Sequence, residues 1–184
     1  MARSRTRANS RDADSSRPGA GPAPVPSLAA ATVPRVWQGI GYRPLSDAAE
    51  ARPLFDYAAL PWPDREVAFA WGAADGTERL IGAVALERSG GAAMLDGPVV
   101  VGGDDPLEIA AQLVAAVLDH ATAAGVRTVY ARPQGLDRVW VRFGFIPVPE
   151  STLPAGLAGR PGAGLYAWRG GTALWTLREE PAGV

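Results

Sequence analysis

The chain has 184 residues, 47% of them hydrophobic, and a formal net charge of −1, which suits one globular domain and gives no general reason to expect nucleic acid or a membrane as a partner. It has no cysteine, so disulfides, thiolate metal sites and a cysteine nucleophile are excluded. A single histidine, His120, leaves few ways to build a zinc site or a Ser-His-Asp triad, and we expect no metal.

The first 35 residues differ in composition from the rest of the chain. Six arginines lie there against two aspartates, so residues 36–184 are acidic overall. Five prolines and few large apolar side chains give this segment little surface to bury against the entropy of ordering. We predict a disordered tail over residues 1–35 and a single domain over residues 36–184. Prolines break the apolar stretch that a secretory signal needs, and we expect a cytoplasmic protein without a membrane span.

The first half of the domain predicts one helix and an antiparallel meander. The helix is expected over residues 48–57, with Ser46 or Asp47 as its cap. Alternating apolar runs, separated by turns such as Asp75-Gly76, predict strands at residues 40–43, 67–71, 80–88 and 92–101. The last strand ends in Val99, Val100 and Val101, a run that indicates burial on both faces.

The second half predicts a parallel crossover. Apolar residues recur every three or four positions over residues 107–124, which predicts a long helix that ends at Gly125. The strand expected over 126–131 would then lie parallel to the strand before the helix. The remaining elements are a short helix at 136–143, a strand at 145–148 and a closing hairpin of 165–169 with 173–178. Residues 149–164 form a long loop, either a lid or a surface excursion.

Four short segments stand out within this order of elements: residues 81–87, 92–101, 123–130 and 140–148. Together with the order of helices and strands, they resemble the GNAT superfamily of acyltransferases over residues 40–178. Residues 144–154 look most like the branch that acetylates small amino acids and arsenic-resistance-type substrates. The resemblance implies an α/β (α+β) fold, in which a mixed sheet with two central, splayed parallel strands is flanked by helices.

The resemblance also implies an activity, the transfer of an acetyl group from acetyl-CoA to the amine of a small molecule. Glu87 stands where related sequences place the carboxylate that accepts the amine's proton, and Trp140 where the family often has the tyrosine that protonates the thiolate. The positions that match the donor site are Val99, Val100, Val101, Gly102, Gly103, Ile109 and Ala110. Tyr130, Arg132 and Trp71 are the expected acceptor residues, with Arg132 suited to hold a substrate carboxylate.

The segment before the long helix departs from the family's pattern of a basic residue followed by glycines. Asp105, Pro106 and Glu108 indicate an N-cap, a first helical proline and a capping box. Such a start occupies N–H groups that a diphosphate needs, and it gathers Asp104, Asp105 and Glu108 around the anion site. Each like-charge contact near 4 Å costs about 4 kcal/mol at a partly shielded surface. We therefore expect weak or absent CoA binding.

Two functions stay open on these grounds. One is the acetyltransferase, and the other is a catalytically inactive GNAT-fold module that binds another ligand or a protein partner. Each site residue also has a purely structural alternative: a solvated strand end for Glu87, core packing for Tyr130 and the tryptophans, and surface charge for Arg132. His120, beside Asp119, predicts a surface histidine rather than a base. The closing hairpin offers an edge at which a second copy could pair, which leaves a homodimer open.

Overall fold

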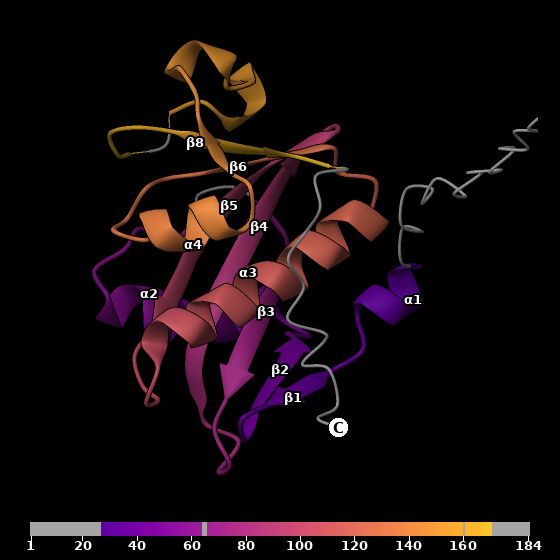
Figure 1. The fold of residues 1–184 in the computed structure, drawn as a ribbon, viewed down its shortest axis with the longest axis vertical. Helices are drawn as coiled ribbons and strands as arrows, with labels where there is room; N and C mark the ends of the chain where they lie inside the picture. Colours follow the sequence, from indigo (N-terminus) through magenta and orange to yellow (C-terminus); the bar gives the residue numbers. More distant parts are fainter. Residues whose placement is uncertain (1–26, 64–65, 160, 171–184) are drawn as a thin grey trace, which may run out of the picture.

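The computed structural model describes residues 27–63, 66–159 and 161–170, and all structural statements concern these residues. A mixed sheet of eight strands, in the order β1-β2-β3-β4-β5-β6-β8-β7, forms the centre of the molecule. Helices α3 and α4 cover one face of the sheet and α2 lies against the other (Figure 1). The fold class expected from the sequence is confirmed.

The observed elements follow the expected order closely. The strands are β1 (Arg35–Trp37), β2 (Ile40–Pro44), β3 (Val67–Ala74), β4 (Leu80–Ser89), β5 (Ala92–Val100), β6 (Thr128–Ala131), β7 (Ile146–Pro147) and β8 (Tyr166–Arg169). The helices are α1 (Leu28–Ala31), α2 (Arg52–Tyr57), α3 (Pro106–Ala123) and α4 (Asp137–Arg142), with 3-10 turns at Ala48–Ala51, Glu150–Thr152 and Ala155–Leu157. β2 to β5 pair antiparallel as the predicted meander, and β5 pairs parallel with β6.

The fold begins earlier than the predicted boundary at residue 36. The side chain of Ser27 accepts a hydrogen bond from the Ala30 N–H and caps α1, and Ala31 is fully buried. Arg35, the first residue of β1, donates to the Asp119 carboxylate at 2.8 Å. Residues 27–35 therefore belong to the folded region, because they pair and pack with α3. Residues 1–26 of the predicted tail lie outside the described part.

Two further expectations need correction or fall outside the structure. Val99 is buried, but Val100 is only partly buried and Val101, beyond the end of β5, is 40% exposed, so the prediction that the run of valines is buried on both faces is wrong for its last two residues. β8 pairs with β6 and β7 inside the sheet. The strand expected over residues 173–178 lies outside the described residues.

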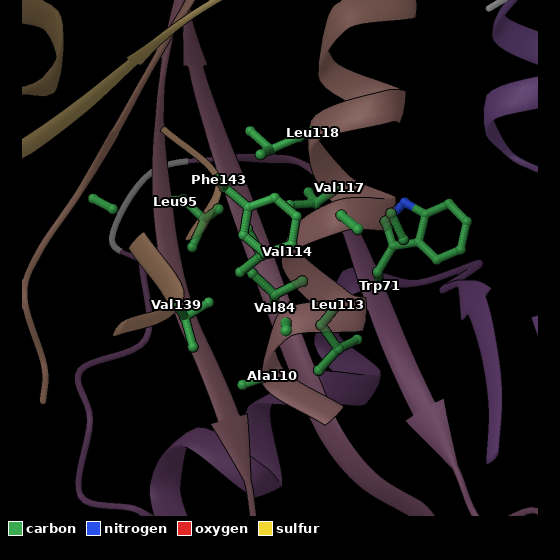
Figure 2. Close-up of a cluster of buried hydrophobic side chains, with 14 of the residues drawn as sticks. Trp71, Val84, Leu95, Ala110, Leu113, Val114, Val117, Leu118, Val139 and Phe143 are labelled. Atoms are coloured by element: carbon green, nitrogen blue, oxygen red, sulfur yellow. The ribbon is translucent and has the colours of Figure 1, made fainter. Parts of the chain in front are cut away.

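The larger core lies between α3 and the sheet (Figure 2). The apolar stripe of α3, with Leu113, Val114 and Leu118, packs on Val84 of β4 and Leu95 of β5. Full burial of each such aliphatic side chain contributes about 1.5–3 kcal/mol. This packing fixes the first turn of α3 relative to β5, and so it positions the site described below. None of the helices in the described ranges is long and apolar enough to span a membrane.

Candidate active site

β5 pairs with β6 over only its first four residues, which is the whole length of β6. Residues 92–95 pair with residues 128–131, and within the described residues the pairing stops there. β5 continues beside β4, whereas the chain after β6 reaches Pro133, which has no N–H to donate to a neighbouring strand. The two strands therefore separate, and Asp96 and Arg132 are the first residues on either side of the gap.

Gly97 makes β5 turn at this point. Ala85 faces Asp96 and Ala83 faces Val99, so β5 holds one residue more than β4 in this stretch, which is a β-bulge. Gly97 has a φ of +87°, a conformation that side chains rarely adopt. A Cβ there would lie 3.0 Å from the Val99 nitrogen and 3.3 Å from Cζ of Phe55. Only glycine fits the bend that separates the strands.

A small cavity, here called the acid pocket, lies at this separation on the α2 face of the sheet. Its volume is about 40 Å³, room for a group of a few heavy atoms. Residues from α2, the segment after it, β5 and the segment after β6 line it, among them Phe55, Leu60, Trp62, Asp96, Arg132 and Gln134. Most of this lining is apolar or aromatic, so a charged group in the pocket is poorly solvated.

Asp96 is the acid of this pocket. Burial raises its pKa to about 7. Its Oδ2 is buried and has no hydrogen-bond partner among the described residues. A carboxyl group that titrates near neutral pH inside a cavity is suited to accept and release a proton.

Tyr130 of β6 and Arg132 just after it hold the long loop against the sheet by hydrogen bonds. Arg132 Nη1 donates to the Glu150 carboxylate and, at 2.8 Å, to the Gly164 carbonyl oxygen. The Tyr130 hydroxyl donates to the Thr152 carbonyl oxygen at 2.8 Å. Leu157 of the loop is buried against the same face. The loop is therefore packed on the sheet beside the acid pocket.

A second, larger cavity, here called the apolar slot, lies next to the acid pocket. Its volume is about 350 Å³, and it lies between β5, the first turn of α3 and the segment before α4. Its lining includes Pro98, Val100, Leu107, Ala110 and Leu136. Leu60 and Gln134 line both cavities, so the two are neighbours. The slot thus extends from the start of α3 to the residues that border the acid pocket.

The first turn of α3 confirms one part of the predicted cap and corrects another. Asp105 Oδ1 accepts the Glu108 N–H at 3.1 Å, so Asp105 is the N-cap and Pro106 the first helical residue. The predicted capping box is wrong, because the Glu108 carboxylate instead accepts from Gln112 at 3.0 Å and from Arg142 at 2.7 Å. Asp105 and Pro106 leave fewer free N–H groups for an anion.

Arginines of α4 balance the acids that the sequence places at this turn. Arg138 and Arg142 line a cavity of about 250 Å³ together with Asp105 and Glu108. Leu107 borders both this cavity and the apolar slot. The carboxylates near the start of α3 are therefore not a purely acidic cluster, because two arginines line the cavity that adjoins the slot at Leu107.

The predicted donor residues divide between the slot and the core. Val100 and Ala110 line the slot, whereas Val99 and Ile109 are buried. The Val101 N–H donates to the Ile81 carbonyl oxygen at 2.8 Å. Gly102 and Gly103 lie in the turn between β5 and α3, and Gly103 needs to be glycine, because its φ is +93° and a Cβ would collide with Ile109.

The structure separates the predicted catalytic and acceptor residues. Glu87 is 1% exposed, and because it lies two residues from Ala85 along β4, it shares the face of Asp96. It does not border the acid pocket. Trp140 is fully buried and donates its indole N–H to the Pro133 carbonyl oxygen at 2.9 Å. The prediction that Trp140 acts at the site is therefore wrong, because its indole N–H already donates to the backbone inside the core.

Trp71 and His120 belong to the opposite face of the sheet. Trp71 is fully buried beside α3 (Figure 2) and donates its indole N–H to His120 Nδ1 at 3.1 Å. The His120 ring stacks on Phe69 with centroids 3.7 Å apart. Trp71 is therefore not an acceptor residue, and the expectation that His120 is a surface histidine is wrong. Both predictions failed because α3 lies across β3, which buries the flank of the helix.

Sequence reasoning missed Asp96. The signal was present: a carboxylate inside an apolar strand, followed directly by Gly97 and Pro98, indicates a bend that opens next to an acid. The sequence also did not indicate that Gln134 lines the apolar slot or that Arg142 lines the cavity beside the start of α3. The described residues contain no group of three His, Asp or Glu side chains that could hold a metal ion.

No protein-family model and no curated protein matches the chain. Solved structures do match. An acetyltransferase of the GNAT family from Staphylococcus aureus Mu50 is 13% identical, with a TM-score of 0.55 over 70% of this chain and 98% of that one. An acetyltransferase from Streptococcus agalactiae 2603 is 16% identical, with a TM-score of 0.56 over 72% and 99%.

A third match contains bound ligands. It is N-acetylglutamate synthase from Neisseria gonorrhoeae in complex with coenzyme A and N-acetyl-glutamate, which is 17% identical, with a TM-score of 0.54 over 73% of this chain and 35% of that one. These likenesses define the class of the fold. The chain has the fold of the GNAT acetyltransferases.

Proposed function

We propose that the protein transfers the acetyl group of acetyl-CoA to the primary amine of a small molecule. The observation that carries the proposal is Asp96, a largely buried acid with a pKa of about 7, in a pocket that adjoins the apolar slot at Leu60 and Gln134. The likeness to acetyltransferases, one of them holding coenzyme A, supports the same class of reaction.

The apolar slot suits the pantetheine arm of acetyl-CoA, because it has a volume of about 350 Å³ and is lined mainly by apolar side chains. It would bring the thioester to the boundary with the acid pocket, near Leu60 and Gln134. The diphosphate would lie near the start of α3. Since Asp105 and Pro106 reduce the N–H groups there, Arg138 and Arg142 would supply much of the positive charge that the anion needs.

Asp96 would act as the general base. The acceptor arrives as an ammonium ion and gives one proton to the ionised Asp96 carboxylate. The neutral nitrogen attacks the thioester carbonyl carbon, and the carbon–sulfur bond breaks as the carbon–nitrogen bond is kept. A second proton leaves the nitrogen and ends on the sulfur of CoA, while Asp96 returns its proton to solvent. The residues that border the slot carry no titratable side chain, so we assign no protein donor to the sulfur.

The proposal extends to the acceptor. Residues 144–154 resemble the branch that acts on small amino acids, so amino acids and simple amines are the acceptors to compare. The alternative, a module that does not turn over acetyl-CoA, is favoured by one observation: Asp105 occupies the helix start that an anion would use.

One pair of measurements separates these two functions. Acetyl-CoA is titrated into the full chain by calorimetry, and release of CoA is then followed with a panel of small amines. Binding followed by amine-dependent release supports the enzyme, and at about 100 times the dissociation constant the ligand adds about 2.7 kcal/mol of stability. An Asp96→Asn variant keeps the binding and loses the release, whereas Asp56→Asn, on an exposed position of α2, keeps both. No binding at millimolar acetyl-CoA contradicts the proposal.

A further inference from the structure

The acid pocket contains two charged groups with different surroundings. Arg132 is 7% exposed and its guanidinium is held by the Glu150 carboxylate and the Gly164 carbonyl oxygen. Asp96 Oδ2 has no hydrogen-bond partner within the described ranges. The positive charge of Arg132 is thus offset by Glu150, while the acid faces the cavity. The ionised Asp96 therefore leaves a negative charge in the pocket. A ligand that neutralises this charge carries a positive group and no negatively charged group beside it.

Two aromatic side chains line the same pocket as Asp96. Trp62 and Phe55 both border the pocket and meet edge to face, with ring centroids 5.1 Å apart and planes at 88°. The face of an aromatic ring attracts a cation, most strongly for tryptophan. An ammonium group between Trp62 and Asp96 would therefore be favoured on both sides.

The size of the pocket limits the cation. A volume of about 40 Å³ admits an –NH₃⁺ group and the carbon that bears it. A carboxylate on that same carbon would add bulk and would lie close to Asp96. Its natural partner would be Arg132, but Nη1 of that guanidinium already donates to the Glu150 carboxylate, which offsets its charge.

We propose that the acceptor is a primary amine whose nitrogen-bearing carbon has no carboxylate, and that the Glu150–Arg132 ion pair excludes the corresponding α-amino acid. Glu150 acts here as a specificity-determining residue: it fills the position at which an amino-acid carboxylate would bind. The inference rests on the proposed function for its reaction, but the preference itself is a property of binding.

The test compares pairs of acceptors that differ only in the carboxylate: isopentylamine with leucine, phenethylamine with phenylalanine, and ethanolamine with serine. Acetyl transfer is measured as kcat/KM in the presence of acetyl-CoA, and binding of each acceptor is measured by calorimetry. In the wild-type chain we expect each amine to be preferred at least tenfold over its amino acid. Binding of the amines should weaken at least tenfold in Asp96→Asn.

A Glu150→Gln variant tests the part played by the ion pair. Glu150 has a side chain that is 54% exposed, so this change is expected to leave the fold intact, which thermal unfolding verifies. It should lower the preference for amine over amino acid, measured as the ratio of kcat/KM values, at least threefold, because the Arg132 guanidinium can then donate to the substrate carboxylate. The matched control, Glu78→Gln in the exposed turn between β3 and β4, should leave the preference unchanged.

The possible results separate this inference from the proposed function. Amines that bind with the expected preference without being acetylated would contradict the enzyme and support the inference. Equal or stronger binding of the amino acids, an unchanged preference in Glu150→Gln, or no binding of either compound would each overturn it.

Discussion

Arg142 donates to the Glu108 carboxylate across 2.7 Å and so joins α4 to the first turn of α3. The two residues are far apart in the sequence, and the contact changes how the start of α3 is understood. Considered alone, Asp104, Asp105 and Glu108 predict an acidic turn that repels a diphosphate. With α4 in place, Glu108 is paired with Arg142, and Arg138 lines the same cavity, so the negative charge of the turn is partly balanced.

The charge balance at this turn should control the affinity for acetyl-CoA. Arg142→Ala is expected to weaken binding about fivefold at low ionic strength, because one contact between unit charges near 4 Å in water is worth about 1 kcal/mol. Glu108→Gln should tighten binding by a similar factor. Calorimetry at 50 mM and 500 mM salt measures both, and the differences should shrink at high salt. Affinities equal to that of Glu78→Gln in both variants would contradict the placement of the diphosphate.

The Trp71–His120 hydrogen bond should make the stability of the protein depend on pH. Burial lowers the pKa of His120 below its usual value of 6.5, and the neutral ring accepts the indole N–H. The unfolded chain therefore binds a proton at a higher pH than the folded one, so this contribution is complete above pH 6.5 and is lost as the pH falls through the folded pKa. Urea unfolding at pH 5 and pH 8 measures the effect.

The variant His120→Leu should reduce the difference between the free energies of unfolding at pH 5 and pH 8. It also leaves the indole N–H of Trp71 without its acceptor, which costs about 1–3 kcal/mol at pH 8. Trp71→Phe provides the comparison, since it removes the donor instead. A pH dependence of the free energy of unfolding that is unchanged in His120→Leu would exclude His120 as its source.

Gly97 should be essential for the separation of β5 from β6. Gly97→Ala places a methyl group 3.0 Å from the Val99 nitrogen at a positive φ, so we expect a loss of about 1–3 kcal/mol and a parallel loss of acetyl transfer. Gly76→Ala is the matched control, because a Cβ there meets no atom within 4 Å. Thermal unfolding of both variants measures the difference in their stability. Equal stability of the two would show that the bend does not depend on glycine.

The carboxyl group of Asp96 should lower the free energy of unfolding at alkaline pH. Its folded pKa of about 7 lies above the value of about 3.9 for an unperturbed aspartate. Stability linked to this group is therefore present at acid pH and is lost as the pH rises through 7. We expect Asp96→Asn to be more stable than the wild type at pH 8, by an amount on the order of 2 kcal/mol. A less stable variant at pH 8 would mean that the carboxylate is held by favourable contacts.

The pattern of apolar residues was sufficient to predict most of the fold. The helical period over residues 107–124 and the alternation in residues 80–101 depend only on which side chains must be buried, so α3 and the meander were placed within a few residues. The start of the folded region was misplaced, because Ala31 and Arg35 are held by α3 rather than by local propensity.

The site was predicted less well, for a physical reason. Glu87 and Asp96 are both acids within apolar strands and lie on one face of the sheet. The acid that meets the cavity is determined by where β5 and β6 separate, and this depends jointly on Gly97 and Pro133 from distant parts of the chain. The Glu150–Arg132 and Glu108–Arg142 pairs are likewise tertiary contacts that no local spacing indicates.

The role of Asp96 as the base can be tested most directly by the pH dependence of acetyl transfer. For the wild-type chain, kcat/KM for a primary amine should rise about tenfold per pH unit below pH 7 and level off above it, because the ionised carboxylate is the active form. Asp96→Asn should lack this inflection and be slower by a factor of about 100 or more. A profile of the same shape and height in Asp96→Asn would contradict the account.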